Sequence, residues 1–174
     1  LGYSHPVIVE AIQSQSQKII HNPCSGLTYS PHRAKLLELL VSLLPENLTR
    51  VFFSNSGAEA NDAAIKLARK VTGRLDVLSF DKSFHGRTIS TASATGQLKQ
   101  RERFNPLMPN YRFIPFNDLE ALKSQMDESL AAVIMEPIQG EGGVNIPDQD
   151  FMSQLSALCE ENGTLLIMDE VQTG

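Results

Sequence analysis

Short apolar runs that each lead into a polar loop recur along this 174-residue chain, and they restrict the possible folds more than any other feature. The run at residues 131–135 is continuous in apolar residues, as strands covered on both faces of a parallel sheet are. Segments with helical spacing alternate with the runs. This alternation predicts an α/β fold, in which a mostly parallel sheet carries helices on both faces. The predicted strands are residues 51–53, 76–80, 111–116, 131–135 and 164–168.

Proline, glycine and capping residues mark the expected ends of the helices. Pro6 follows a polar residue and starts a predicted helix within residues 4–20. Gly73 ends the predicted helix that follows the turn at 54–61. The apolar side chains of that helix should share one buried face. They are Ala60, Ala64, Leu67, Ala68 and Val71.

Three further helices are predicted, and the segments between them give weaker signals. A helix at 34–44 should pack in the core, another should begin at the Asn117–Glu120 capping box, and Asp148 should cap a helix at 151–161. Residues 21–33 read as loop because they hold two prolines and a glycine. Residues 89–112 carry few signals.

The turn between the first predicted strand and its helix has the residues of an anion site. Ser56, Gly57 and Ala58 are small, so backbone N–H groups stay uncovered at a helix N-terminus. Those donors and the helix dipole favour a phosphate monoester. The alternative is an ordinary N-capped helix with nothing bound, because Ser and Asn are common capping residues.

The loop after the second run gathers an aromatic ring, an imidazole and a guanidinium. Phe84 could stack on a planar ligand, and Arg87 could hold a carboxylate through two hydrogen bonds. His85 reads as a hydrogen-bonded structural residue, since a lone histidine needs a positioned partner to act as an acid or base.

Carboxylates and glycines follow the runs at 131–135 and 164–168. Glu141 lies among glycines, and Gly142 and Gly143 would let the backbone approach a ligand. This segment does not match the dinucleotide fingerprint, because its spacing is different. Asp169 comes directly after the last run, where it could bind a ligand or cap a neighbouring turn.

Ligands of open parallel sheets bind outside the carboxyl ends of the strands. By that rule Ser56, Phe84, Glu141 and Asp169 should converge on one crevice. A phosphate cradle, a stacking ring and a strand-end carboxylate together suit a planar, phosphorylated, cationic cofactor. Pyridoxal 5′-phosphate fits that description, and Asp169 could keep its ring nitrogen protonated.

Charge and composition argue against several other classes of protein. The net charge is −5 without a basic patch, which argues against nucleic-acid binding. The sequence has no run of about 18 apolar residues, so it predicts no membrane span, and no secretory signal opens it. Cys24 and Cys159 lack metal-ligand spacing, so we expect no metal site and a reducing compartment. The expected location is the cytoplasm, or an organelle matrix if a targeting segment has been lost.

Four motifs in this order resemble the class III, pyridoxal-phosphate-dependent aminotransferases, and most of all the acetylornithine branch of that family. The resemblance covers nearly the whole chain. It implies the large domain of a fold-type I transferase, present here in part over residues 1–174. The motifs are Ser56–Asn61, Phe84–Thr88, Glu136–Gly143 and Asp169–Gly174.

The resemblance implies a role for each matching residue. Ser56 and the amides of Gly57 and Ala58 would bind the cofactor phosphate. Phe84 and Val171 would pack on opposite faces of the ring, and Gln172 would reach the phenolic oxygen. Asp169 would pair with the ring nitrogen and is the expected catalytic residue of this chain. Arg87 would bind the substrate α-carboxylate, and Glu141 would lie on the substrate side.

For the full-length protein the resemblance implies transfer of an ω-amino group, from a donor such as acetylornithine, to 2-oxoglutarate in a homodimer. Ornithine and 4-aminobutyrate aminotransferases are the near alternatives, and a racemase or aminomutase on the same scaffold is another. We interpret the chain as part of a longer one, because the family's Schiff-base lysine would follow Gly174. A truncated, non-catalytic ligand-binding fragment is the alternative from a different class.

Overall fold

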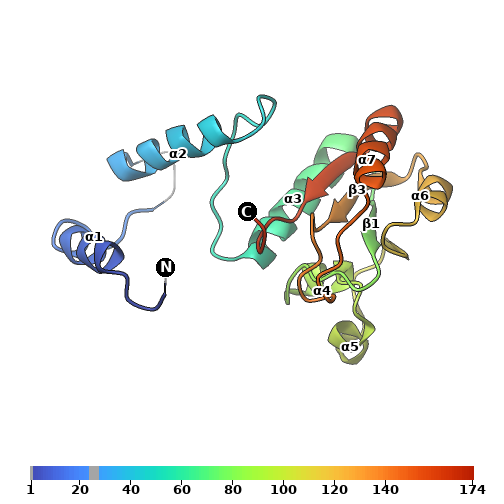
Figure 1. Ribbon diagram of the computed structural model, residues 1–174, viewed down its shortest axis with the longest axis horizontal. Helices are drawn as coiled ribbons and strands as arrows, with labels where there is room; N and C mark the ends of the chain where they lie inside the picture. Colours follow the sequence, from blue (N-terminus) through green and yellow to red (C-terminus); the bar gives the residue numbers. More distant parts are fainter. Residues whose placement is uncertain (1, 24–27) are drawn as a thin grey trace. The chain divides into compact units, whose positions relative to one another are not determined.

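The computed structural model describes residues 2–23 and 28–174, which divide into an N-terminal unit, Leu1–Phe53, and a C-terminal unit, Ser54–Gly174 (Figure 1). Cys24, for which the sequence predicts no metal-ligand role, lies outside the described residues. No described helix is both long enough and apolar enough to cross a bilayer.

The N-terminal unit contains two helices, α1 (Pro6–Ser16) and α2 (Pro31–Leu43). Both begin with proline at the first helical position, and the side chain of Ser30 caps α2 by accepting a hydrogen bond from the Arg33 N–H at 3.3 Å. The predicted loop therefore ends at residue 30 instead of 33.

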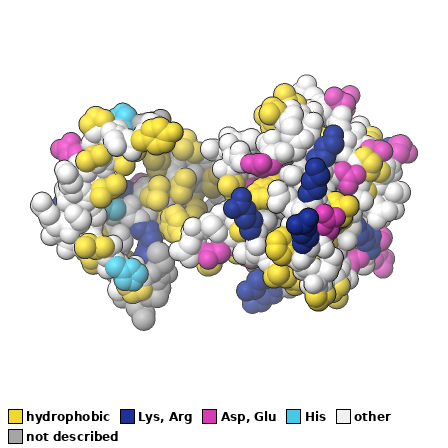
Figure 2. Space-filling view, turned by 90° about the horizontal axis from the view of Figure 1, so that it is seen from below, with side chains coloured by type: hydrophobic (Ala, Val, Ile, Leu, Met, Phe, Trp, Pro, Cys, Tyr) yellow, Lys and Arg dark blue, Asp and Glu magenta, His cyan; other side chains and the backbone are white. Residues whose placement is uncertain are grey.

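Two predictions for this unit are wrong. None of the α2 residues is buried, so α2 is not packed in a core, and Figure 2 shows hydrophobic side chains at the surface. Residues 51–53 form no strand, and the Phe52 side chain is 78% exposed. A strand needs a neighbour to pair with its backbone groups, and no described strand lies next to this segment. The apolar residues of α2 and of residues 51–53 therefore predicted burial, but the described chain buries neither segment.

The C-terminal unit is built on a four-stranded parallel sheet, as predicted. Its strands follow the order β2-β1-β3-β4, and every neighbouring pair is parallel. Three of the strands match the predicted runs within one residue, and β2 ends two residues early. The strands are β1 (Asp76–Phe80), β2 (Tyr111–Ile114), β3 (Leu130–Met135) and β4 (Leu165–Met168).

Helices cover both faces of this sheet, which confirms the predicted architecture (Figure 1). On one face Ile65 and Ala94 pack with Val77 and Ile134. On the other face a larger core forms around Phe80, whose ring meets Phe116 and Phe151 edge-on at centroid distances of 5.9 Å. The helices are α3 (Gly57–Thr72), α4 (Ile89–Ala94), α5 (Leu98–Arg101), α6 (Leu119–Gln125) and α7 (Gln149–Asn162), with a 3-10 turn η1 (Glu102–Phe104).

Helix α3 ends as predicted, but it buries a different face. Gly73 adopts a left-handed φ of 70° and ends the helix. The buried residues are Asn61, Ile65 and Ala68, whereas Leu67 and Val71 are 59% and 65% exposed. The predicted face included Ala68 but left out Asn61 and Ile65. Asn61 is polar, and two hydrogen bonds satisfy its amide in the interior.

Two predicted caps also differ in detail. Asp118, not Asn117, caps α6 by accepting from the Ala121 N–H at 2.9 Å. Asp148 stands at the N-cap of α7, but its carboxylate makes no cap hydrogen bond. It accepts from the Asn117 side-chain amide at 2.8 Å instead. Residues 89–112, which gave few signals, contain α4, α5 and η1.

Candidate active site

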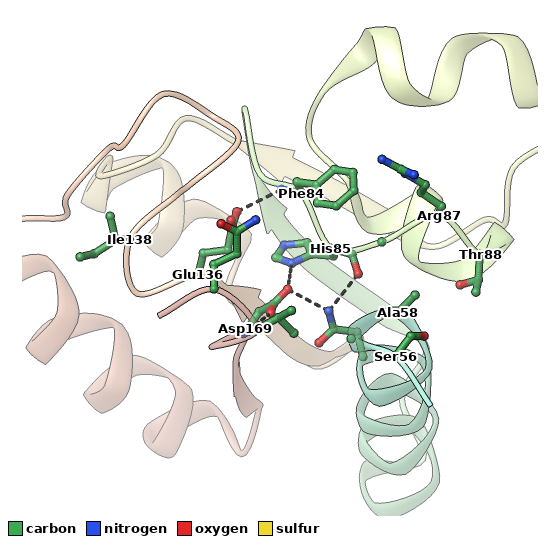
Figure 3. A pocket seen from close by; sticks show the side chains of 14 residues that line it. Ser56, Ala58, Phe84, His85, Arg87, Thr88, Glu136, Ile138 and Asp169 are labelled. Carbon is green, nitrogen blue, oxygen red and sulfur yellow. Dashed lines mark hydrogen bonds and ion pairs between the residues drawn. The ribbon is translucent and has the colours of Figure 1, made fainter. Parts of the chain in front are cut away.

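A cavity of about 530 Å³ opens at the carboxyl ends of the strands in the C-terminal unit (Figure 3). Its wall comes from the first turn of α3, the loop after β1, the loop after β3 and the segment after β4. This is the edge of a parallel sheet where ligands bind. The predicted crevice is therefore present, and most of the predicted site residues line it.

The first turn of α3 forms one side of the cavity. Ser56 caps the helix, because its Oγ accepts from the Glu59 N–H at 3.2 Å and its carbonyl accepts from the Ala60 N–H at 3.0 Å. The N–H groups of Gly57 and Ala58 come before the first residue that can find an acceptor within the helix. Both residues line the cavity, so it has backbone donors at a helix N-terminus.

Two glycines allow the walls of the cavity to approach one another. A Cβ atom on Gly57 would lie 2.6 Å from Cγ2 of Val171. Gly86 has a φ of +136°, and a Cβ there would lie 2.6 Å from Cβ of Ala58. Larger residues at either position would push α3 away from the loop after β1 or from the segment after β4.

Asp169 is the most heavily hydrogen-bonded acid of the cavity. Its Oδ2 accepts from His85 Nδ1 and from Asn61 Nδ2, both at 2.8 Å, and its Oδ1 accepts from the Val171 N–H at 3.2 Å. Burial alone would raise the pKa of this carboxyl, but the hydrogen bonds from these donors, with His85 contributing most, leave the pKa below its ordinary value. Asp169 therefore carries a negative charge in an interior site.

His85 is held by the hydrogen bond of its ring to Asp169 and by two hydrogen bonds of its backbone, as expected for a structural histidine. The residue is 2% exposed, its N–H donates to Thr95 Oγ1 at 3.0 Å, and its carbonyl accepts from Asn61 Nδ2 at 2.9 Å. Because an ionised carboxylate only accepts hydrogen bonds, the Nδ1 facing Asp169 carries a proton. Its Nε2 is buried and has no partner among the described residues.

Glu136 ties the loop after β1 to the loop after β3. Its Oε2 accepts from the Phe84 N–H at 3.0 Å, and its Oε1 accepts from the Gly140 N–H at 3.4 Å. Burial raises the pKa of this carboxyl, and the two backbone donors offset only part of that effect. Glu136 thereby fixes the backbone from which the Phe84 ring projects.

Arg87 and Thr88 continue the loop after β1 along the rim of the cavity. Arg87 is exposed and lines the cavity, so its guanidinium is accessible to a ligand. Thr88 donates from Oγ1 to Asp62 Oδ2 at 2.8 Å, which joins this loop to α3. Figure 3 shows Phe84, His85, Arg87 and Thr88 following one another along the same loop.

Glu141 is the predicted site residue that the structure leaves outside. It is exposed and does not line the cavity, where Glu136 at the end of β3 lies instead. The expected close backbone approach at Gly142 serves packing between loops, since a Cβ there would lie 2.6 Å from the Lys82 carbonyl oxygen. The described chain therefore does not bring Glu141 to the cavity, and its role on the substrate side stays a prediction.

Sequence reasoning missed Asn61 and Glu136 as members of the cavity. Asn61 falls at the helical spacing of Ile65 and Ala68, which could have identified it as an inward-facing polar residue. Glu136 directly follows the fully apolar strand β3, as Asp169 follows β4, and that position could have identified it.

Neither a cluster of metal ligands nor a reactive thiol is found among the described residues. Within residues 2–23 and 28–174, no three His, Cys, Asp or Glu side chains come together as metal ligands. The Cys159 thiol is buried, and burial raises its pKa to about 12, so it is protonated and inert.

Comparison with known proteins gives a consistent result. A family model described as "Aminotransferase class-III" matches residues 1–174. The chain is 47% identical to an acetylornithine aminotransferase of Methanopyrus kandleri over 174 residues and 51% identical to one of Bacillus anthracis over 176 residues. Each match covers 100% of this chain but 44% of the relative, so the chain spans less than half the length of these proteins.

Among solved structures, the chain resembles the taurine:2-oxoglutarate aminotransferase of Bifidobacterium kashiwanohense, whose structure is a complex with PLP and glutamate. The TM-score is 0.91 at 32% identity, and the match covers 100% of this chain and 44% of that one.

Proposed function

The chain belongs to the class-III aminotransferase family, and on that premise we propose that its cavity binds pyridoxal 5′-phosphate for the transfer of an amino group. Residues 1–174 would form part of the large, cofactor-binding domain of the full-length protein. The observation that carries the proposal is the ionised Asp169, buried in a cavity that the N-terminus of α3 also lines.

The chemistry of the cavity fits this cofactor. Backbone N–H groups at a helix N-terminus suit its phosphate, and a buried carboxylate held below its ordinary pKa suits a cationic ring nitrogen. The Phe84 and Val171 side chains both line the cavity and could cover the two faces of a flat ring. The volume of about 530 Å³ is in the range of small-molecule sites.

We assign the residue roles as follows. Ser56, Gly57 and Ala58 bind the phosphate, and Gln172 reaches the phenolic oxygen. Asp169 pairs with the ring nitrogen, and Arg87 binds the α-carboxylate of the substrate. Glu141, exposed in this chain, would reach the substrate only in the full-length protein.

The cofactor, when bound, supplies the electron sink that stabilises negative charge at the substrate carbon. The residues of this chain prepare the site for that chemistry. Asp169 keeps a positive charge on the ring nitrogen, because the hydrogen bonds from His85 and Asn61 hold it ionised. Phe84 would pack on the ring, and the hydrogen bond from its N–H to Glu136 holds the backbone that carries its side chain.

For the full-length protein we propose an ω-amine similar to acetylornithine as donor and 2-oxoglutarate as acceptor. The two acetylornithine aminotransferases support the donor, and the taurine:2-oxoglutarate aminotransferase supports the acceptor. Homodimer formation and a cytoplasmic location complete the proposal, the latter supported by the archaeal and bacterial origin of these relatives.

The test is a transfer assay on the full-length protein, with pyridoxal 5′-phosphate binding measured separately by absorption spectroscopy. Acetylornithine, ornithine, 4-aminobutyrate and taurine serve as donors, and formation of glutamate from 2-oxoglutarate is the readout. We expect saturable cofactor binding and the highest kcat/KM with acetylornithine. Cofactor binding without transfer from any donor would contradict the proposed reaction, and a higher kcat/KM with another donor would contradict the proposed substrate.

A further inference from the structure

Asn61 joins three of the elements that form the cavity. The residue projects from α3, and its Nδ2 donates to the His85 carbonyl at 2.9 Å and to Asp169 Oδ2 at 2.8 Å. It is 5% exposed. Helix α3, the loop after β1 and the segment after β4 therefore meet at one side-chain amide.

Both contacts require an amide at this position. A primary amide has two N–H hydrogens on one nitrogen, one for each acceptor. A serine hydroxyl could serve only one of the two, and an aspartate carboxylate could serve neither. His85 also donates to Asp169 Oδ2, but it does not make Asn61 redundant, because the Asn61 amide holds the backbone carbonyl of His85.

The hydrogen bonds divide the two oxygens of Asp169 into different roles. Oδ2 accepts from two donors, His85 and Asn61, and both bonds are 2.8 Å. Oδ1 accepts only from the Val171 N–H, at 3.2 Å. Since each carboxylate oxygen offers about two acceptor sites, Oδ1 is the oxygen with capacity left for a further donor.

We propose that Asn61 is a positioning residue of the cofactor site. By holding Oδ2 of Asp169 and the carbonyl of His85 against α3, it leaves Oδ1 as the atom that pairs with the protonated ring nitrogen. The inference rests on the proposed function, because it concerns the same cofactor. It adds a link between the helix turn that binds phosphate and the carboxylate that binds the ring.

The link spans one turn of α3. Asn61 follows Gly57 by four residues, so both lie on the same side of the helix, about 6 Å apart along its axis. The backbone donors and the Asp169 carboxylate are thus fixed to one rigid element. A change at Asn61 should alter the recognition of the ring nitrogen without altering the recognition of the phosphate.

The test compares two cofactor analogues that lack the aldehyde and so cannot bond covalently to a lysine. One is 4′-deoxypyridoxine 5′-phosphate, and the other is the same compound with a C–H group in place of the ring nitrogen. Their dissociation constants are measured by equilibrium titration of the cofactor-free, full-length protein. The ratio of the two constants reports only the ring-nitrogen interaction.

We expect the unmodified protein to prefer the ring-nitrogen analogue by at least about tenfold, the strength of a charge-assisted hydrogen bond. In Asn61→Ala the affinity for that analogue should fall about tenfold, and the affinity for the C–H analogue should change less than about twofold. Equal weakening of both analogues would overturn the inference, because it is the result of a merely structural role.

Asn162→Ala is the matched control. Asn162 Nδ2 also donates to two acceptors, the Asp127 carbonyl at 2.9 Å and Thr164 Oγ1 at 2.8 Å, but it lies at the end of α7, outside the cavity. Its replacement should leave the ratio unchanged. If Asn61→Ala does not fold, Asn61→Leu keeps the approximate size of the side chain without a donor and should lower the ratio by the same reasoning; an unchanged ratio there would overturn the inference.

The outcomes separate this inference from the proposed function. If the unmodified protein binds neither analogue, the proposed function itself fails. If it binds both equally, Asp169 does not pair with the ring nitrogen, and the role of Asn61 is overturned while phosphate binding stands.

Discussion

Gly57 and Val171 are in such close contact that a Cβ atom on Gly57 would lie 2.6 Å from Cγ2 of Val171. The first turn of α3 therefore meets the segment after β4 without room for any side chain at residue 57. These residues are 114 positions apart in the sequence. The contact closes one side of the cavity, and the cost of adding a methyl group at residue 57 can be measured directly.

Gly57→Ala should destabilise the protein by about 1–3 kcal/mol, the usual cost of overpacking. Helix propensity alone would favour alanine over glycine within α3, so a loss of stability isolates the contact with Val171. Urea unfolding gives the free energy. The double variant Gly57→Ala/Val171→Ala should recover most of the loss, and a failure to recover it would mean that the contact is not the cause.

Asp169→Ala in the full-length protein should lower kcat by about 100-fold or more, the size of effect seen when a preorganised electrostatic partner is removed. The cofactor affinity should fall less. Asp150→Ala, an exposed acid in the first turn of α7, is the control and should leave both values unchanged. Near-normal kcat in Asp169→Ala would remove this residue from its assigned role.

Arg87→Ala in the full-length protein should raise KM about tenfold or more for both the amino donor and 2-oxoglutarate, because each presents an α-carboxylate to the same guanidinium. Arg87→Lys should recover only part of the loss, since an ammonium lacks the fork of donors. Lys99→Ala removes an exposed charge from α5 and is the control. A rise in KM for the amino donor alone would contradict the assignment.

Stability in acid should depend on Arg112, which lies away from the cavity. Its Nη1 donates to Asp127 Oδ2 at 2.7 Å, and its Nη2 donates to Asp76. Hydrogen bonds from Ser129 and then from Arg112 lower the pKa of Asp127 to about 2. A carboxyl with a folded pKa below its unfolded value of about 3.9 stabilises the protein above pH 4, and that stabilisation is lost as the pH falls towards 2.

Between pH 4 and pH 2 the free energy of unfolding should therefore fall less in Arg112→Met than in the unmodified protein. Urea unfolding at several pH values measures this difference. Arg103→Met, which changes an exposed arginine of η1, should keep the decrease of the unmodified protein. The same slope in Arg112→Met and in the unmodified protein would mean that Arg112 does not hold the acids ionised.

The sequence was sufficient to predict the sheet and the place of the cavity. Strands β3 and β4 are continuous in apolar residues, and glycines end the helices at residues 73 and 163, so local signals agreed with the fold. Because parallel strands end at one edge, Phe84 and Asp169 could be brought together before any coordinates were known.

The sequence did not predict burial that depends on specific partners. Asn61 is polar, and only its two acceptors explain why it faces the sheet. Glu136 and Glu141 are five residues apart, and residue type alone does not distinguish the one that lines the cavity from the one that is exposed. For α2 the apolar residues signal a need for burial, but they do not specify the surface that would satisfy it.

The placement of Asp169 after β4 makes the site a late product of folding. Its partners His85 and Asn61 precede it by 84 and 108 residues, so each bond closes a long loop of chain. In the described sheet β4 is an edge strand, paired only with β3. A nascent chain can thus form the turn at Ser56 long before it holds the carboxylate. In the proposed site, cofactor recognition through Asp169 would therefore report that the edge of the sheet has docked.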